Sequence, residues 1–299
     1  MAEIAKRQPD TLHRRWRAGE AVPPHVYFLI SSIFHYLGPA FAVLLFAHVG
    51  VLGVAWLRIA SAAVVFALWR RPWRVLARAF WSQCRLFIAL GIVLGIMNAC
   101  FYLAIARLPL GTVGTIEFLG SMTLAAIGIR TARNLGALGL TLAGVALLTH
   151  VRLAGEPLGF LFAFANASLF MLYVILGHRI ARDGGAEGID RLGASMLIAL
   201  LAVSPIGITE VAPVLTHPEL LLAGIGVGIC SSVIPYVCDQ LAMARLPRAA
   251  FALLLALLPA SATLIGVVVL RQIPSALELG GVALVICGVA VHQEAQVGE

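Results

Sequence analysis

Long apolar runs alternate with short polar connections over most of the 299-residue chain. Each of ten such runs has about the length, roughly 20 residues, that an α-helix needs to cross a bilayer. The runs lie at about 24–46, 48–69, 84–106, 109–130, 134–151, 157–180, 191–213, 219–244, 247–270 and 275–292. The pattern predicts an all-α integral membrane protein with ten transmembrane helices, in which short loops make consecutive helices antiparallel neighbours.

Composition strengthens this prediction and excludes a pair of soluble domains. Hydrophobic residues make up 61% of the chain and charged residues 12%, and the mean hydropathy is +0.98. A soluble domain is closer to half apolar and a quarter charged. The net charge of +7 would suggest nucleic acid in a soluble chain. Here the arginines lie between apolar runs, so we expect a lipid bilayer and no nucleic acid as partner.

The distribution of Lys and Arg predicts the orientation. Residues 1–22 are polar and basic, and they lack the apolar core of a signal peptide, so we expect a cytoplasmic tail. With the N-terminus inside, 17 of the 21 Lys and Arg residues fall in the tail and the inner connections, and three fall in the outer ones. This asymmetry predicts that both termini are cytoplasmic and that the number of spans is even.

Short sequence matches indicate an internal repeat. The tetrapeptide Ala-Arg-Leu-Pro at 106–109 recurs at 244–247. We therefore expect a first five-helix repeat at 23–151 and a second at 157–292. Because five is odd, the second repeat enters the membrane in the opposite direction. Such inverted repeats are typical of secondary transporters, whose substrate site lies near the midplane between the repeats.

Two segments give the chain a specific family resemblance. RLPLGTVGTIEFLGS at 107–121 and IPYVCDQLAMARLP at 234–247 resemble the EamA branch of the drug/metabolite transporter superfamily. Within it they are most similar to the threonine/homoserine exporter group and to related aromatic amino-acid exporters. The chain departs from these exporters at Leu258, where they usually carry a glutamate, and at Arg271-Gln272, where a Gly-Glu pair is common.

The resemblance and the repeat together imply a function. We expect a multi-pass protein of the bacterial inner (plasma) membrane that acts as a secondary active transporter. It would export amino acids or similar small metabolites by alternating access around a central cavity, with a proton as a candidate coupling ion. The alternative is efflux of cationic or aromatic drug-like compounds.

Three ionisable residues lie within predicted spans, where an unpaired charge costs several kcal/mol. Glu117 and Arg58 both fall near mid-membrane, so one interpretation is a structural ion pair that locks two helices together. The other is that Glu117 contacts the substrate or a proton while Arg58 has a structural role. Asp239 lies near the cytoplasmic end of its span, where it either contributes to translocation or reaches interfacial water or Arg245.

Uncharged polar residues complete the candidate site. Each is either an interhelical hydrogen-bonding group or a substrate contact. These candidates are His35, Tyr36, Asn98, Tyr102, Asn166, Tyr173, Tyr236 and Gln240. Helix-perturbing residues with expected structural or gating roles are Gly38, Pro39, Pro235 and Pro259, and the Gly38-Pro39 pair is expected to unwind the first helix beside a cavity.

Enzyme chemistry has little support in this sequence. The chain shows no phosphate-binding loop, no zinc-ligand spacing and no nucleophile constellation, and its glycine-rich runs lie within apolar helices. We therefore expect neither an enzyme nor a bound cofactor or metal, and a small-molecule substrate as the ligand.

Overall fold

The computed structural model describes residues 22–128, 131–152, 156–181, 185–246, 251, 254 and 257–291. Helices dominate these ranges, and no strand occurs within them. The longer helices are α2 (Pro24–Leu45), α3 (Val51–Arg70), α5 (Trp81–Ile105), α6 (Leu110–Gly128), α7 (Ala132–Arg152), α8 (Pro157–Ala181), α9 (Gly185–Gly207), α11 (Pro218–Gly228), α12 (Ile234–Met243), α14 (Leu257–Leu270) and α15 (Ala276–Val291). Shorter elements are α4 (Trp73–Arg78), the 3₁₀ turn η1 (Ile208–Val211), α10 (Ala212–Thr216) and the π-helical segment η2 (Ile229–Val233).

The prediction of an all-α membrane protein is confirmed for the described residues. Six helical segments are long and apolar enough to cross a bilayer: Pro24–Leu45, Val51–Arg70, Gln83–Ile105, Pro157–Ala181, Glu187–Val214 and Pro218–Met243. Shorter apolar helices are Leu110–Leu119, Ala132–Leu148, Leu258–Leu270 and Ala276–Gly288. The count of ten spans, the inverted repeat and the orientation stay predictions, and residues 1–21 of the expected tail lie outside the described part of the chain.

Helix α2 corrects one sequence-based expectation. It runs unbroken from Pro24 to Leu45 through the Gly38-Pro39 pair, which was expected to unwind it. Gly38 instead permits close helix packing, because a Cβ at this position would lie 2.4 Å from the Cβ of Ser231 in η2. The glycine therefore brings α2 against η2, and both Gly38 and Pro39 are buried in that contact.

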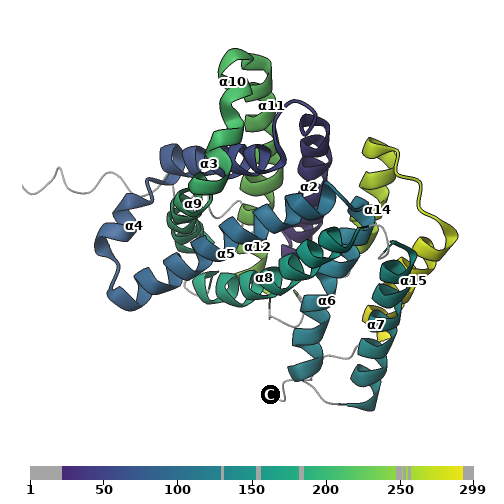
Figure 1. Ribbon diagram of the computed structural model, residues 1–299. Helices are drawn as coiled ribbons and strands as arrows, with labels where there is room; N and C mark the ends of the chain where they lie inside the picture. The colour runs from purple at the N-terminus through teal and green to yellow at the C-terminus, as the bar shows by residue number, and fades with distance from the viewer. Residues whose placement is uncertain are drawn as a thin grey trace, which may run out of the picture.

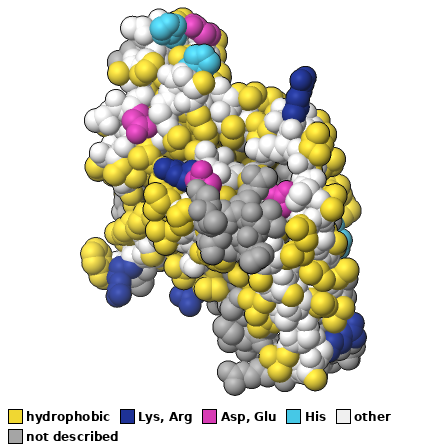
Figure 2. Space-filling model, turned by 45° about the vertical axis from the view of Figure 1, so that its right-hand side comes forward, with side chains coloured by type: hydrophobic (Ala, Val, Ile, Leu, Met, Phe, Trp, Pro, Cys, Tyr) yellow, Lys and Arg dark blue, Asp and Glu magenta, His cyan; other side chains and the backbone are white. Residues whose placement is uncertain are grey.

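The helices surround a central region that both halves of the chain supply (Figure 1). Helix α2 packs against α12 and α14, α5 lies between α8 and α9, and α6 contacts both α8 and α14. Helices α7 and α15 pack side by side along their length and contact the remaining helices through α6 and α14. On the face seen in Figure 2, hydrophobic and uncharged side chains dominate and charged ones are scattered, which suits a lipid-facing surface.

Candidate functional site

Glu117 lies at the centre of the site and is 1% exposed. Its Oε1 accepts a hydrogen bond from Nδ2 of Asn166 at 2.9 Å, and its Oε2 accepts one from the phenol of Tyr36 at 2.8 Å. Nε2 of His35 lies 3.5 Å from the same Oε2. These donors come from α2 and α8 and offset the cost of burying the carboxylate. The structure thus brings four of the predicted site residues together.

Arg58 does not bond to Glu117, so the predicted structural ion pair is wrong. Its Nε donates to the hydroxyl of Ser232 at 2.8 Å, and its Nη2 donates to the carbonyl of Ser231 at 2.5 Å. The guanidinium also lies 5.4 Å from the ring centroid of Tyr102, in cation–π geometry. Pro235 explains this position. Proline has no N–H, so Pro235 cannot supply the α-helical donor to the Ser231 carbonyl four residues earlier, and Arg58 donates to that carbonyl instead.

Asp239 forms a second buried carboxylate site, 5% exposed, on α12. Its Oδ1 accepts a hydrogen bond from the Ser31 hydroxyl at 2.5 Å, and its Oδ2 accepts one from the Tyr173 phenol at 2.8 Å. The expected contact with Arg245 is absent among the described contacts, since that side chain donates to the Val22 carbonyl and lies over another ring. The burial also rules out contact with interfacial water in this conformation.

Some of the other polar candidates line the central cavity between the helices, and others lie outside it. Nδ2 of Asn98 donates to the Tyr236 phenol oxygen at 3.1 Å, which joins α5 to α12. Gln240 is fully buried on α12 next to Gly177 and Gly188, and it is not among the side chains that line the central cavity. Pro259 is a buried residue of α14.

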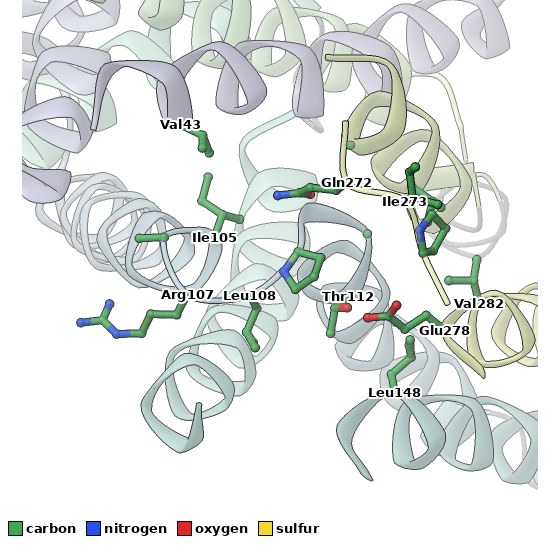
Figure 3. Close-up of a pocket in the computed structure, with 16 residues that line it drawn as sticks. Val43, Ile105, Arg107, Leu108, Thr112, Leu148, Gln272, Ile273, Glu278 and Val282 are labelled. Atoms are coloured by element: carbon green, nitrogen blue, oxygen red, sulfur yellow. The ribbon is translucent and has the colours of Figure 1, made fainter. Parts of the chain in front are cut away.

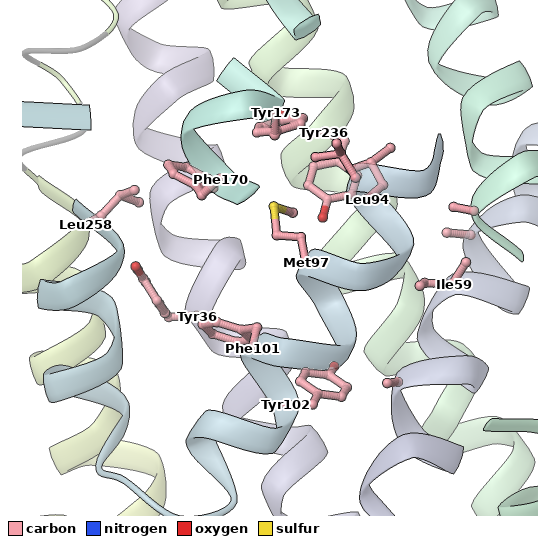
Figure 4. Packing of buried hydrophobic residues seen from close by; sticks show 14 of the residues in the cluster. Tyr36, Ile59, Leu94, Met97, Phe101, Tyr102, Phe170, Tyr173, Tyr236 and Leu258 are labelled. Carbon is pink, nitrogen blue, oxygen red and sulfur yellow. The ribbon is translucent and has the colours of Figure 1, made fainter. Parts of the chain in front are cut away.

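Aromatic rings of α2, α5, α8 and α12, among them Tyr36, Phe101, Phe170, Tyr173 and Tyr236, form a shell in the core (Figure 4). The ring of His35 lies edge-on to Phe170 at 5.8 Å and to Phe101 at 6.4 Å between centroids. The rings of Tyr173 and Tyr236 are 5.4 Å apart. Sequence analysis missed both phenylalanines because apolar rings in an apolar helix carry no distinguishing pattern.

Ser31 was missed as well, although the sequence held a signal for it. It lies four residues before His35, so the two side chains share one face of α2. Nothing in the sequence indicated that this face meets two carboxylates.

A small cavity lies between these residues. It is lined by His35, Arg58, Met97, Asn98, Phe101, Glu117, Asn166 and Tyr236. Its volume is about 10 Å³, which is at most enough for a single water molecule. The central site is therefore closed in this conformation.

A larger cavity of about 360 Å³ lies beside the turn between α5 and α6, and we call it the peripheral cavity (Figure 3). Thr112 and Glu278 point toward each other across it, while Arg107 points away. Oε1 of Gln272 accepts a hydrogen bond from the backbone N–H of Leu110 at 3.0 Å, which caps the start of α6. This cavity has the size of ordinary small-molecule pockets.

Comparison with known proteins relates the chain to a family of transporters. Residues 157–292 match the EamA-like transporter family. The threonine/homoserine exporter RhtA of Escherichia coli K12 is 28% identical over 289 residues, which cover 92% of this chain and 95% of that protein. RhtA of Salmonella typhimurium SL1344 is 28% identical over 274 residues, 89% of this chain and 88% of that protein. The chain is thus similar over its second half to the EamA-like transporter family and over most of its length to these two exporters.

A solved structure shares the fold of this chain. A crystal structure with 20% sequence identity matches with a TM-score of 0.55 and covers 89% of this chain and 96% of that chain. The six apolar helices of this chain are long enough to cross a bilayer, as a multi-pass membrane protein requires.

Proposed function

We propose that this protein is an EamA-type secondary active transporter that exports amino acids or similar small metabolites by alternating access. The relatives named as threonine/homoserine exporters cover about nine-tenths of the chain. The observation that carries the proposal is Glu117, a carboxylate buried among neutral donors and a histidine at the meeting point of α2, α6 and α8.

Glu117 is suited to hold the ammonium group of an amino acid. A carboxylate and an ammonium form a charge-assisted hydrogen bond, which is about twice as strong as a neutral one. Tyr36 and Asn166 hold the carboxylate in place from two different helices. In the proposed mechanism the ammonium replaces part of this hydrogen-bond set when the site opens.

The closed central cavity supports a mechanism in which helices move. A volume of about 10 Å³ cannot hold an amino acid, so α2, α5, α6, α8 and α12 must rearrange to admit one. In the proposed topology of ten spans in a 5+5 inverted repeat, with both termini inside, the first three of these helices belong to the first repeat and the last two to the second. The peripheral cavity then lies on the outer side, where exported substrate would leave.

A second candidate, efflux of cationic or aromatic compounds, has its own supporting observation. The aromatic shell places the rings of His35, Phe101 and Phe170 close to one another beside Glu117. Aromatic faces next to a carboxylate bind organic cations through cation–π interactions. The shell would therefore suit a flat cation if the site opened far enough.

Transport in proteoliposomes distinguishes the two candidates. We expect vesicles loaded with unlabelled threonine to take up radiolabelled threonine by exchange, whereas protein-free vesicles do not. Parallel assays use radiolabelled phenylalanine and a cationic dye. Exchange of the dye but of neither amino acid would support the second candidate, and exchange of none of the three would contradict the proposed function.

A further inference from the structure

Asp239 differs from Glu117 in what surrounds its carboxylate. It lies four residues before α12 ends at Met243, at the end of this helix that the distribution of Lys and Arg places toward the cytoplasm. Both of its hydrogen-bond donors, Ser31 and Tyr173, are hydroxyl groups. A hydroxyl can reverse its role, because it can accept a hydrogen bond while it donates another.

Ser31 is placed to make that reversal. Its Oγ lies 2.5 Å from Oδ1 of Asp239 and 3.3 Å from the carbonyl oxygen of Pro235. When Asp239 is ionised, Ser31 donates to Oδ1. When a proton binds Oδ1, the new O–H donates to Ser31 Oγ, and the Ser31 hydroxyl turns to donate to the Pro235 carbonyl. Tyr173 continues to donate to Oδ2, so both protonation states are fully hydrogen-bonded without any helix movement.

Glu117 lacks an equivalent arrangement among the described residues. Its Oε1 faces the amide nitrogen of Asn166, which donates and does not accept. Its Oε2 faces the phenol of Tyr36 and the Nε2 of His35. The described hydrogen bonds give neither Tyr36 nor Asn166 a second acceptor of the kind that Ser31 has in Pro235. Protonation of Glu117 would therefore require the Asn166 amide to flip or His35 to accept a hydrogen bond at Nε2, while protonation of Asp239 requires only rotation of the Ser31 hydroxyl.

We infer that Asp239 is the binding site of the coupling proton, while Glu117 keeps its charge for the substrate. The inference rests on the proposed export function. It assigns proton binding to Asp239 and substrate binding to Glu117. Helix α2 connects them, because Ser31 and His35 lie one turn apart and contact Asp239 and Glu117 respectively.

Other titratable groups surround Asp239 without replacing it as the proton site. His35 on α2 is near enough to act on it electrostatically, and Cys238 is its neighbour on α12. The helices packed against α12 also carry Tyr173 and His178 on α8 and Arg191 on α9, Tyr236 lies on α12 itself, and Arg58 lies on α3, which packs against η2. Arg58 bonds to η2 and Arg191 to Glu187.

The test separates exchange of substrate from its coupling to protons. The purified full-length protein is reconstituted with a pH-sensitive dye inside the vesicles, and radiolabelled threonine is the substrate. For the wild-type protein we expect a pH gradient to drive threonine accumulation and threonine addition to move protons. For Asp239→Asn we expect at least a tenfold loss of both, with threonine–threonine exchange retained within about twofold.

Three controls keep the result interpretable. Glu117→Gln should lose exchange itself. Ser168→Ala should change nothing, because it removes an exposed hydroxyl whose bond within the described part of the chain is to Phe164 on its own helix. Ser31→Ala should weaken proton-driven accumulation while it preserves exchange. Thermal unfolding of each purified variant identifies any that fail to fold. If Asp239→Asn misfolds, Asp239→Glu replaces it, and we then expect the pH profile of threonine accumulation to shift.

Particular results would overturn the inference. Proton-driven accumulation in folded Asp239→Asn at the wild-type level would exclude Asp239 as the proton site, and so would loss of exchange in that variant. A wild-type protein that exchanges threonine but moves no protons would also overturn it, while the proposed export function would survive. Absence of exchange in the wild-type protein would contradict the proposed function itself.

Discussion

The phenol of Tyr36 donates a hydrogen bond to Glu117 across the contact between α2 and α6, with 2.8 Å between the oxygen atoms. Both side chains are buried, and the same phenol lies against Gly114 one turn earlier on α6. The hydrogen bond therefore depends on a close approach of two helices that only a glycine permits. Any opening of the central cavity that separates these helices must break it.

Replacing Glu117 tests the substrate role directly. We expect Glu117→Gln to fold but to lower the initial rate of threonine exchange at least tenfold. A hydrogen bond to a charged group contributes roughly 1.5–3 kcal/mol, and about 1.4 kcal/mol corresponds to a factor of ten. Glu187→Gln is the matched control, because that carboxylate is exposed and, among the residues the structure describes, bonds to Arg191 on the same helix. Equal rates for both variants would exclude Glu117 from the substrate site.

Removal of the Tyr36 hydroxyl should have a smaller effect. Tyr36→Phe keeps the ring contacts and leaves Asn166 to hold Glu117, so we expect exchange to fall about three- to tenfold, with folding preserved. Tyr27→Phe serves as the control, since the Tyr27 ring lies beside Arg245 and not beside Glu117. An unchanged rate in Tyr36→Phe would show that the phenol does not orient the carboxylate.

Arg58 and Pro235 should be energetically coupled. Arg58→Gln removes the donor to the Ser231 carbonyl, and we expect it to destabilise the protein by about 1–3 kcal/mol. Pro235→Ala restores a backbone N–H at the position where that carbonyl needs one. The loss caused by Arg58→Gln should therefore be smaller in the Pro235→Ala background, as measured by thermal unfolding in detergent. Strictly additive losses would contradict this explanation of Arg58.

The same series tests whether Arg58 and Glu117 act as a pair. Because they bond to different partners, we expect the double variant Arg58→Gln/Glu117→Gln to be no more stable than Arg58→Gln alone. Recovery of both stability and exchange in the double variant would support a structural ion pair between Arg58 and Glu117.

Gly114 and Gly136 form a matched pair of glycine substitutions. A Cβ at Gly114 would lie 2.5 Å from the Cβ of Ala262 and 2.9 Å from the Tyr36 hydroxyl. We expect Gly114→Ala to push α14 and Tyr36 away from α6 and to lower exchange several-fold. At Gly136 a Cβ would meet nothing within 4 Å, so Gly136→Ala should leave exchange unchanged and stabilise α7 by up to about 1 kcal/mol. Equal effects of the two substitutions would show that the contact at Gly114 is unimportant.

Hydropathy and charge predicted much of this protein from the sequence. The apolar runs indicated the membrane class, and the segments 107–121 and 234–247 indicated a resemblance to the EamA family, whose model matches residues 157–292. Glu117 and Asp239 could be selected as candidates because each is a carboxylate within an apolar run, where a charge is costly. These predictions needed only local sequence, so they could be made without knowledge of any contact between helices.

The partners of those residues were decided only by the tertiary structure. Tyr36 and Glu117 are 81 residues apart in sequence, and Ser31 and Asp239 are 208 apart. A helix that faces lipid on one side and protein on the other is apolar on both, so hydropathy does not fix its rotation about its own axis. The sequence therefore placed Arg58 and Glu117 at similar depth, and the rotation and packing of α3 and α6 gave each a different partner.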